Sequence, residues 1–229
     1  MIIAIDGPAA SGKSTTAKLV GQELNFLYID TGAMYRAMTL KAKKLNIDYE
    51  DTEKVISIIQ TTDIDQIIDS STGDTKTFLD GVDVSLEIRT PEISKGVTAV
   101  CEIKEVRENL VNIQRIMGKR KDVILDGRDI GTVVFPDADL KFFMVADVDV
   151  RAQRRFKELS EKGISSSLED IKADIVRRDE RDSSRSNSPL KPAEDAILID
   201  TSELTISEQV EFIVNKIKNE KMRNGKNEN

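Results

Sequence analysis

The segment DGPAASGKST, residues 6–15, constrains the fold more than any other part of this sequence. It follows the apolar residues MIIAI, and it has the spacing Gly-x-x-x-x-Gly-Lys-Ser. A loop of this kind between a strand and a helix directs backbone N–H groups at phosphate oxygens, aided by the positive end of the helix. The segment therefore predicts a loop that binds the phosphates of a nucleoside triphosphate, formed by Gly7, Pro8, Ala9, Ala10, Ser11, Gly12, Lys13, Ser14 and Thr15.

Two side chains of this loop have expected roles of their own. Lys13 supplies a mobile cation for the β and γ phosphates, and Ser14 offers a hydroxyl to Mg²⁺. The alternative is a glycine-rich turn with an incidental lysine, but the full spacing and the flanking elements favour the phosphate loop. The motif does not identify the acceptor, because hydrolases, small-molecule kinases and nucleotide-sensing switches share it.

The absence of histidine among the 229 residues excludes an imidazole base and any zinc site with histidine ligands. The single cysteine, Cys101, cannot form an internal disulfide. The apolar start is too short for a secretory signal, and no apolar run approaches the roughly 20 residues of a membrane span. We therefore expect a soluble protein in the cytoplasm with no membrane partner.

The chain has 34 basic and 41 acidic side chains, and this net charge of −7 argues against a nucleic-acid partner. Arginines nevertheless gather in the segments DGRD, VRAQRRFK and IVRRDERDSSR. This clustering predicts a site for a small, highly charged anion, because binding follows the local field. No exposed apolar stripe is left over once the core is assigned, so we expect a monomer.

Five short apolar runs predict buried strands. They are rich in Ile, Val, Leu or Phe and do not alternate with polar residues, which is typical of a parallel sheet covered by helices on both faces. The runs end at or next to an aspartate or glycine, so ligands are expected at the carboxyl ends of the strands. The predicted fold is α/β, with strands over residues 2–6, 26–30, 122–127, 141–146 and 196–201. Between residues 61 and 90 apolar and polar residues alternate, which predicts a small antiparallel insert.

One arginine lies in the apolar stripe of a predicted helix. Laid out at about 100° per residue, residues 92–117 place several apolar side chains on one face. Arg107 falls within that stripe, which consists of Ile93, Val97, Val100, Ile103, Leu110 and Val111. Either the aliphatic part of its side chain packs in the core while its guanidinium reaches water, or the guanidinium points into a cleft and binds a base or a phosphate.

A second helical face changes from apolar to charged. In residues 168–185, the face of Leu168, Ile171 and Ile175 continues through the charged residues Arg178, Asp182 and Arg185. A helix that leaves the core and then borders a ligand cavity has this pattern. Ion pairing between residues four apart on a solvated surface explains it equally well.

Two further strand ends carry candidate ligands. In VILDGRD, Asp126 ends a buried strand, from which a carboxylate can hold Mg²⁺ through water, and Arg128 and Asp129 follow. An Asp-Gly turn is the simpler explanation of this segment. In IDTGAMYRAM, Asp30 and Thr31 end a strand and cap a helix that carries Tyr35 and Arg36 in its first turns.

Taken together, these motifs identify a family resemblance. The strings IDGPAASGKST, DTGAMYRA, FLDGVDVSLEIRTPE, VRENL, LDGRDIGTVVFPDA and RRDERDSSRSNSPL occur in order between about residue 2 and residue 215 and resemble the bacterial cytidylate kinases. The resemblance implies a P-loop kinase with a five-stranded parallel core, a lid and a monophosphate-binding insert. It also implies transfer of the γ-phosphoryl group of ATP to CMP or dCMP, which gives the diphosphate and ADP.

The resemblance also implies roles for particular residues. The phosphate-binding arginines of the family match Arg36, Arg128 and Arg185, its base contacts match Arg107, Asp129 and Thr98, and its ribose contacts match Arg178 and Asp182. Lys13, Arg128 and Arg185 are the expected catalytic residues, Arg154 and Arg155 of the lid are expected to bind ATP, and Thr31 and Tyr35 are expected to bind substrate. Thr98 would point almost opposite Arg107 on a regular helix, so either the helix is broken near Gly96 or this contact does not carry over.

These observations predict one kinase domain. Its core is expected at about residues 1–60, 91–150 and 186–215, its insert at about 61–90, its lid at about 151–185 and a disordered tail at about 218–229. Two rival functions stay open. A kinase for another small acceptor, such as UMP or shikimate, would share the phosphate loop, and so would a nucleotide switch without enzymatic activity.

Overall fold

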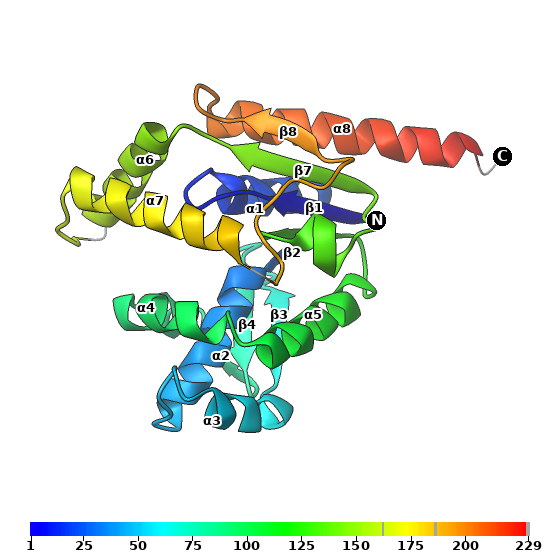
Figure 1. The fold of residues 1–229 in the computed structure, drawn as a ribbon. Coiled ribbons are helices and arrows are strands. Elements are labelled where there is room, and N and C mark those ends of the chain that lie inside the picture. The colour runs from blue at the N-terminus through cyan, green and yellow to red at the C-terminus, as the bar shows by residue number, and fades with distance from the viewer. Residues whose placement is uncertain (162, 186, 228–229) are drawn as a thin grey trace. The chain divides into compact units, whose positions relative to one another are not determined.

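The computed structural model describes residues 1–161, 163–185 and 187–227, with side chains up to residue 223. Five strands form one parallel sheet in the order β2-β6-β1-β7-β8 (Figure 1). The strands are β1 (Ile2–Asp6), β2 (Leu27–Asp30), β6 (Val123–Gly127), β7 (Leu140–Val145) and β8 (Ile197–Asp200). The predicted α/β fold with a five-stranded parallel sheet is therefore confirmed, and all five apolar runs are strands.

The chain divides into two compact units, of which the first comprises Met1–Phe26 and Ile124–Asn229. In this unit β7 pairs in parallel with β1 and with β8, with Ile5 beside Phe142 and Phe142 beside Ile197. Ile5 and Phe142 are almost completely buried, as expected for strands with covered faces. The helices of the unit are α1 (Lys13–Leu24), α6 (Val148–Glu161), α7 (Leu168–Ser184) and α8 (Ile206–Asn227), and a π-helical turn, η3, spans Ile130–Val134.

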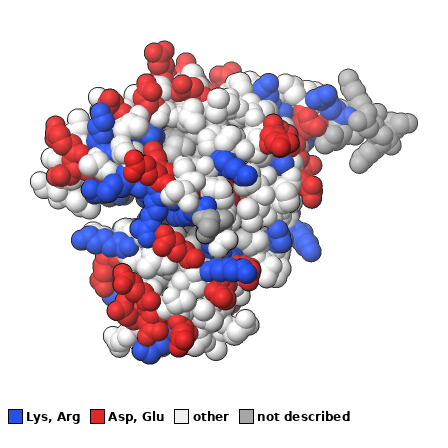
Figure 2. All heavy atoms as spheres, in the orientation of Figure 1, with Lys and Arg blue, Asp and Glu red and all other residues white. Residues whose placement is uncertain are grey.

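The predicted lid region, residues 151–185, contains most of α6 and all of α7. The two helices pack through Ala152, Ile171 and Ile175, and Ala10 of the phosphate loop packs against the same cluster. Ser167 caps α7 by accepting a hydrogen bond from the N–H of Asp170. Figure 2 shows basic and acidic side chains close together on the surface formed by these helices, at the left of the view.

The second unit is Leu27–Val123. Its antiparallel sheet has the order β3-β4-β5 and is formed by Ile64–Ile68, Thr75–Leu79 and Val82–Asp83, within the predicted insert. Its α-helices are α2 (Thr31–Lys44), α3 (Thr52–Ser57), α4 (Pro91–Val100) and α5 (Lys104–Gly118). Short 3₁₀ turns, η1 and η2, span Ile59–Thr61 and Glu87–Arg89.

The structure differs from expectation in two places. The single helix expected over residues 92–117 is two helices, α4 and α5, separated at residues 101–103, where Ile103 has extended backbone angles. The disordered tail expected at about residues 218–229 is instead helical as far as Asn227, where α8 ends, and its last two residues lie outside the described part of the chain. Lys, Glu, Met and Arg are good helix formers, so a helix already held by packing can continue without an apolar pattern.

Among the described residues, no helix has both the length and the hydropathy that crossing a bilayer requires.

Candidate nucleotide-binding site

The glycines of the phosphate loop are required by close packing and by backbone angles. A Cβ atom on Gly7 would lie 2.2 Å from the carbonyl oxygen of Met144 in β7, and Gly7 has a φ of 155°. Gly12 has a φ of 95° at the N-cap of α1, a conformation that side chains disfavour. Glycine at positions 7 and 12 is therefore what allows the loop to run along the carboxyl edge of the sheet and to enter the helix.

Lys13, at the start of α1, is buried, and its Nζ atom donates a hydrogen bond to the carbonyl oxygen of Pro8 at 3.2 Å. Burial, together with the positive charge of Arg128, lowers the pKa of Lys13 to about 7. The charges that act on Lys13 also include those of Asp126, Arg178 and Asp182. Residues that are far apart in the sequence are thus gathered around the phosphate loop within the first unit.

The lowered pKa of Lys13 predicts that the affinity for ATP, the expected ligand of the loop, depends on pH. Bound phosphates favour the charged amine, so above about pH 7 binding takes up a proton at Lys13 and the affinity falls as the pH rises. We expect the dissociation constant of Mg-ATP to increase by up to about tenfold per pH unit above pH 7. Titration calorimetry in buffers with different ionisation heats measures both the affinity and the proton uptake. The variant Lys13→Met should show neither the proton uptake nor the pH dependence of the affinity. An affinity of the natural protein that does not change with pH would contradict the expectation.

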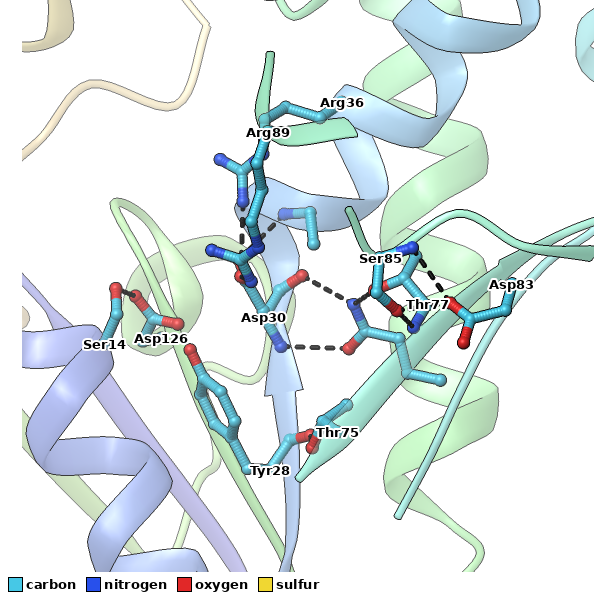
Figure 3. A network of polar contacts seen from close by, with 12 residues as sticks. Ser14, Tyr28, Asp30, Arg36, Thr75, Thr77, Asp83, Ser85, Arg89 and Asp126 are labelled. Atoms are coloured by element: carbon cyan, nitrogen blue, oxygen red, sulfur yellow. Dashed lines mark hydrogen bonds and ion pairs between the residues drawn. The ribbon is translucent and has the colours of Figure 1, made fainter. Parts of the chain in front are cut away.

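The two predicted magnesium ligands lie side by side. The hydroxyl of Ser14 donates a hydrogen bond to Oδ2 of Asp126 at 2.6 Å (Figure 3). Asp126 is buried near the end of β6, whereas Ser14 is exposed at the start of α1. A hydroxyl and a carboxylate are hard oxygen ligands, and Mg²⁺ binds few protein groups and keeps the remaining positions for phosphates and water. The donor set fits this ion, and within the described part of the chain no cluster of three or more His, Cys, Asp or Glu residues offers another metal site.

A buried carboxylate joins two of the predicted catalytic arginines. Oδ2 of Asp182 accepts from Nε of Arg128 at 2.8 Å, and Oδ1 of Asp182 lies 2.6 Å from a terminal nitrogen of Arg185. Burial acts to raise the pKa of Asp182, but Arg128 and Arg185 outweigh it and hold the pKa below its usual value. The charged half of the face predicted on residues 168–185 is therefore an organised cluster, and Asp182 is buried in it.

The lid arginines differ in where they lie. Arg151 is buried, donates to the carbonyl oxygens of Ala146 and Ala9, and pairs with Asp179 of α7 at 2.6 Å. Arg154 donates to Thr201, whose hydroxyl donates to the carbonyl oxygen of Ser11 in the phosphate loop, and Arg155 pairs with Glu158. Arg151 donates to the loop directly, and the pattern of the run VRAQRRFK, which contains all three arginines, does not distinguish it.

In the second unit, two arginines converge on Asp30. Of the two residues expected to cap this helix, Asp30 is the N-cap of α2, with Oδ1 accepting from the N–H of Ala33, and Thr31 is the first residue of the helix. Oδ2 of Asp30 lies 3.2 Å from Arg36 and 3.4 Å from Arg89 (Figure 3). The Nε atom of Arg36 is buried and has no acceptor among the described residues, so it could bind an anion. Arg89 was not predicted, although the string EIRTPE contains it.

Arg107 is buried, with its guanidinium carbon 5.6 Å from the centre of the Tyr35 ring. One terminal nitrogen donates to the carbonyl oxygen of Cys101 at 3.4 Å. The interpretation in which its head reaches water is therefore wrong. Thr98 is half-buried on α4, on the other side of the interruption from Arg107, so a single helical phase does not relate these two residues.

Comparisons with known proteins place these features in context. A family model described as cytidylate kinase matches residues 3–219. The chain is 50% identical over 223 residues to a protein named cytidylate kinase from Lactobacillus johnsonii, covering 96% of each chain. It is 51% identical over 217 residues to one from Clostridioides difficile, covering 95% of this chain and 98% of the relative. A crystal structure of an uncharacterized protein from Eubacterium ventriosum shares the fold, with a TM-score of 0.54 at 11% identity over 96% of this chain and 98% of that chain.

Proposed function

Because this chain belongs to the cytidylate kinase family, we propose that it transfers the γ-phosphoryl group of ATP to CMP and dCMP and releases ADP. The observation that carries this proposal is the gathering of Lys13, Arg128 and Asp182 around the phosphate loop, next to the paired Ser14 and Asp126. In the proposal the enzyme is a monomer of the cytoplasm, and residues 151–185 act as its lid.

Phosphoryl transfer between two nucleotides depends on charge neutralisation and alignment more than on a proton acceptor. The attacking oxygen of a monophosphate is already ionised, so the reaction needs no base and can proceed without histidine. Lys13 would hold the β and γ phosphates of ATP, and Arg128 and Arg185 would neutralise the charge on the group in transfer. Ser14 and Asp126 would hold Mg²⁺, which would supply further positive charge to the bound phosphates.

The proposal also assigns residues to the acceptor. Arg36, with the buried Nε atom described above, would bind the monophosphate together with Thr31 and Tyr35. Arg107, Asp129 and Thr98 would contact cytosine. The remaining assignments are Arg178 and Asp182 for the ribose and Arg154 and Arg155 for ATP, and all of them come from the family resemblance.

Replacing Arg107 by methionine is expected to raise KM for CMP by about 100-fold and to leave KM for ATP nearly unchanged. The buried guanidinium beside Tyr35 provides a fork of donors that methionine lacks. Steady-state kinetics with each substrate varied in turn measure both constants. Arg120→Met is the matched control, because Arg120 follows α5 and forms an exposed ion pair with Asp65. An equal rise in both constants for Arg107→Met would contradict a contact with the base.

A coupled assay of ADP release over a panel of acceptors tests the proposal as a whole. The natural protein should release ADP rapidly with CMP or dCMP, more slowly with UMP, and hardly at all with AMP or shikimate. The product should be confirmed as CDP by chromatography. Rapid turnover of shikimate or of another acceptor in preference to CMP would identify a different kinase, and slow hydrolysis that no acceptor accelerates would indicate a nucleotide switch.

A further inference from the structure

A buried carboxylate next to the phosphate loop has no part in the mechanism described above. Asp6 ends β1, and its two oxygens accept the backbone N–H groups of Ile130 and Gly131, each at 2.8 Å. Burial raises the pKa of this carboxyl to about 7 even though both hydrogen bonds favour its charged form. Asp6 is thus removed from solvent and bonds directly to a segment 124 residues further along the chain.

The partner segment is the π-helical turn η3, which begins directly after Asp129. The first N–H groups of any helical turn have no partner inside it, and Asp6 accepts two of them. The carbonyl oxygen of Asp129 in turn accepts from the N–H of Val133 at 2.8 Å. Asp6 therefore fixes the backbone directly after Asp129, which is itself buried.

Close packing adds a second constraint on the same segment. A Cβ atom on Gly131 would lie 3.1 Å from Cδ of Lys141 and 3.5 Å from Oδ2 of Asp6. The contact with Lys141 is tight, whereas the distance to Asp6 is an ordinary van der Waals contact. The segment that follows Asp129 is therefore held by two hydrogen bonds to Asp6 and by close packing against Lys141, so a change at Asp6 acts on the backbone next to Asp129.

The position of Asp6 in the sequence gives this contact a functional meaning. Its backbone leads into Gly7 and the phosphate loop, while its side chain holds the segment that contains Arg128 and Asp129. We propose that Asp6 is a positioning residue for acceptor recognition, which holds Asp129 in place for the cytosine base relative to the ATP phosphate loop. This inference rests on the proposed function, in which Asp129 contacts the base.

The variant Asp6→Asn tests the inference, with Asp139→Asn as its matched control. An asparagine at position 6 keeps the size of the side chain but turns an amide N–H₂ group toward one of the two backbone donors, which then lacks an acceptor. Asp139 directly precedes β7 and accepts the N–H of Ile2 at 2.6 Å, at the opposite end of β1 from Asp6. Its replacement therefore removes a carboxylate that is hydrogen-bonded to the same strand but not to the segment after Asp129.

We expect Asp6→Asn to raise KM for CMP by about tenfold and to reduce the preference for CMP over UMP, with KM for ATP unchanged. Asp139→Asn should leave all three quantities as they are in the natural protein. A folded Asp6→Asn variant with unchanged KM for CMP and unchanged preference would overturn the inference. An equal rise of both KM values would also overturn it, because a general loss of structure would have that effect.

A second measurement uses the natural chain and does not depend on the variant folding. The backbone amides of Ile130 and Gly131 report the contact with Asp6, and their hydrogen exchange can be followed by NMR. Saturating CMP should slow exchange at both amides, because a base bound at Asp129 restrains the segment, whereas ADP alone should not. Unchanged exchange with CMP would refute the inference. Failure of the natural protein to phosphorylate CMP would instead refute the proposed function, so the two failures are distinguishable.

Discussion

Replacing Lys13 by methionine is expected to lower kcat for CMP phosphorylation by about 10³-fold or more. Methionine has nearly the length of lysine but no charge, so the phosphate loop keeps its packing while the cation for the β and γ phosphates is lost. The loss should be large because Lys13 is buried next to the loop, where its charge is weakly screened. The rate is measured with both substrates saturating.

Two controls accompany Lys13→Met: its unfolding temperature and the replacement of a second lysine, Lys218. The charged amine of Lys13 opposes folding at neutral pH, because its pKa is lower in the folded chain than the ordinary value of 10.5. Lys13→Met should therefore keep or raise the unfolding temperature. Lys218→Met removes an exposed lysine that forms a 3.5 Å ion pair with Glu23 of α1, and it should leave kcat unchanged. A kcat for Lys13→Met within about tenfold of the natural value would contradict the role assigned to this amine.

The second large effect is expected for Arg128→Met, which should reduce kcat by roughly 10³-fold. The positive charge of Arg128 lowers the pKa of Lys13, and its Nε atom donates to Asp182. Arg128 therefore lies among the groups expected to surround the phosphoryl group. Asp182 keeps its ion pair with Arg185 in this variant, so the buried carboxylate still has a positively charged partner. The loss should therefore appear mainly in kcat and to a smaller extent in stability.

Arg177→Met is the matched control for Arg128→Met. Arg177 is exposed on α7 and pairs with Asp174 on the same helix, one residue before the predicted ribose ligand Arg178. Its replacement removes one positive charge from the same unit and should change neither kcat nor KM. If both variants lost activity to the same extent, net charge rather than the position of Arg128 would account for the effect.

The central sheet and the phosphate loop were predictable because their signals are local. Each strand is a short apolar run, and the loop follows from fixed spacing around Gly7 and Gly12. The approach of Ser14 to Asp126 could also be anticipated, since both residues lie at the carboxyl edge of one parallel sheet. The family resemblance is confirmed by the match over residues 3–219.

The contacts of individual arginines could not be read from sequence. An arginine side chain is long, so its helical phase does not determine which partner it reaches, and Arg151 rather than Arg154 or Arg155 contacts the phosphate loop. The interruption between α4 and α5 has no proline or glycine to mark it. The link from Asp6 to Ile130 joins segments 124 residues apart, and a single carboxylate at a strand end does not indicate which distant backbone it will bind.

In the proposed function, one chain binds two negatively charged nucleotides at once, through basic side chains from segments that are distant in the sequence. Titration calorimetry with a single compound that joins adenosine and cytidine through a chain of phosphates tests this simultaneous binding most directly. We expect this compound to bind at least about 100-fold more tightly than ATP or CMP alone, because both halves are held together. Binding no tighter than that of ATP would contradict simultaneous binding of the two nucleotides.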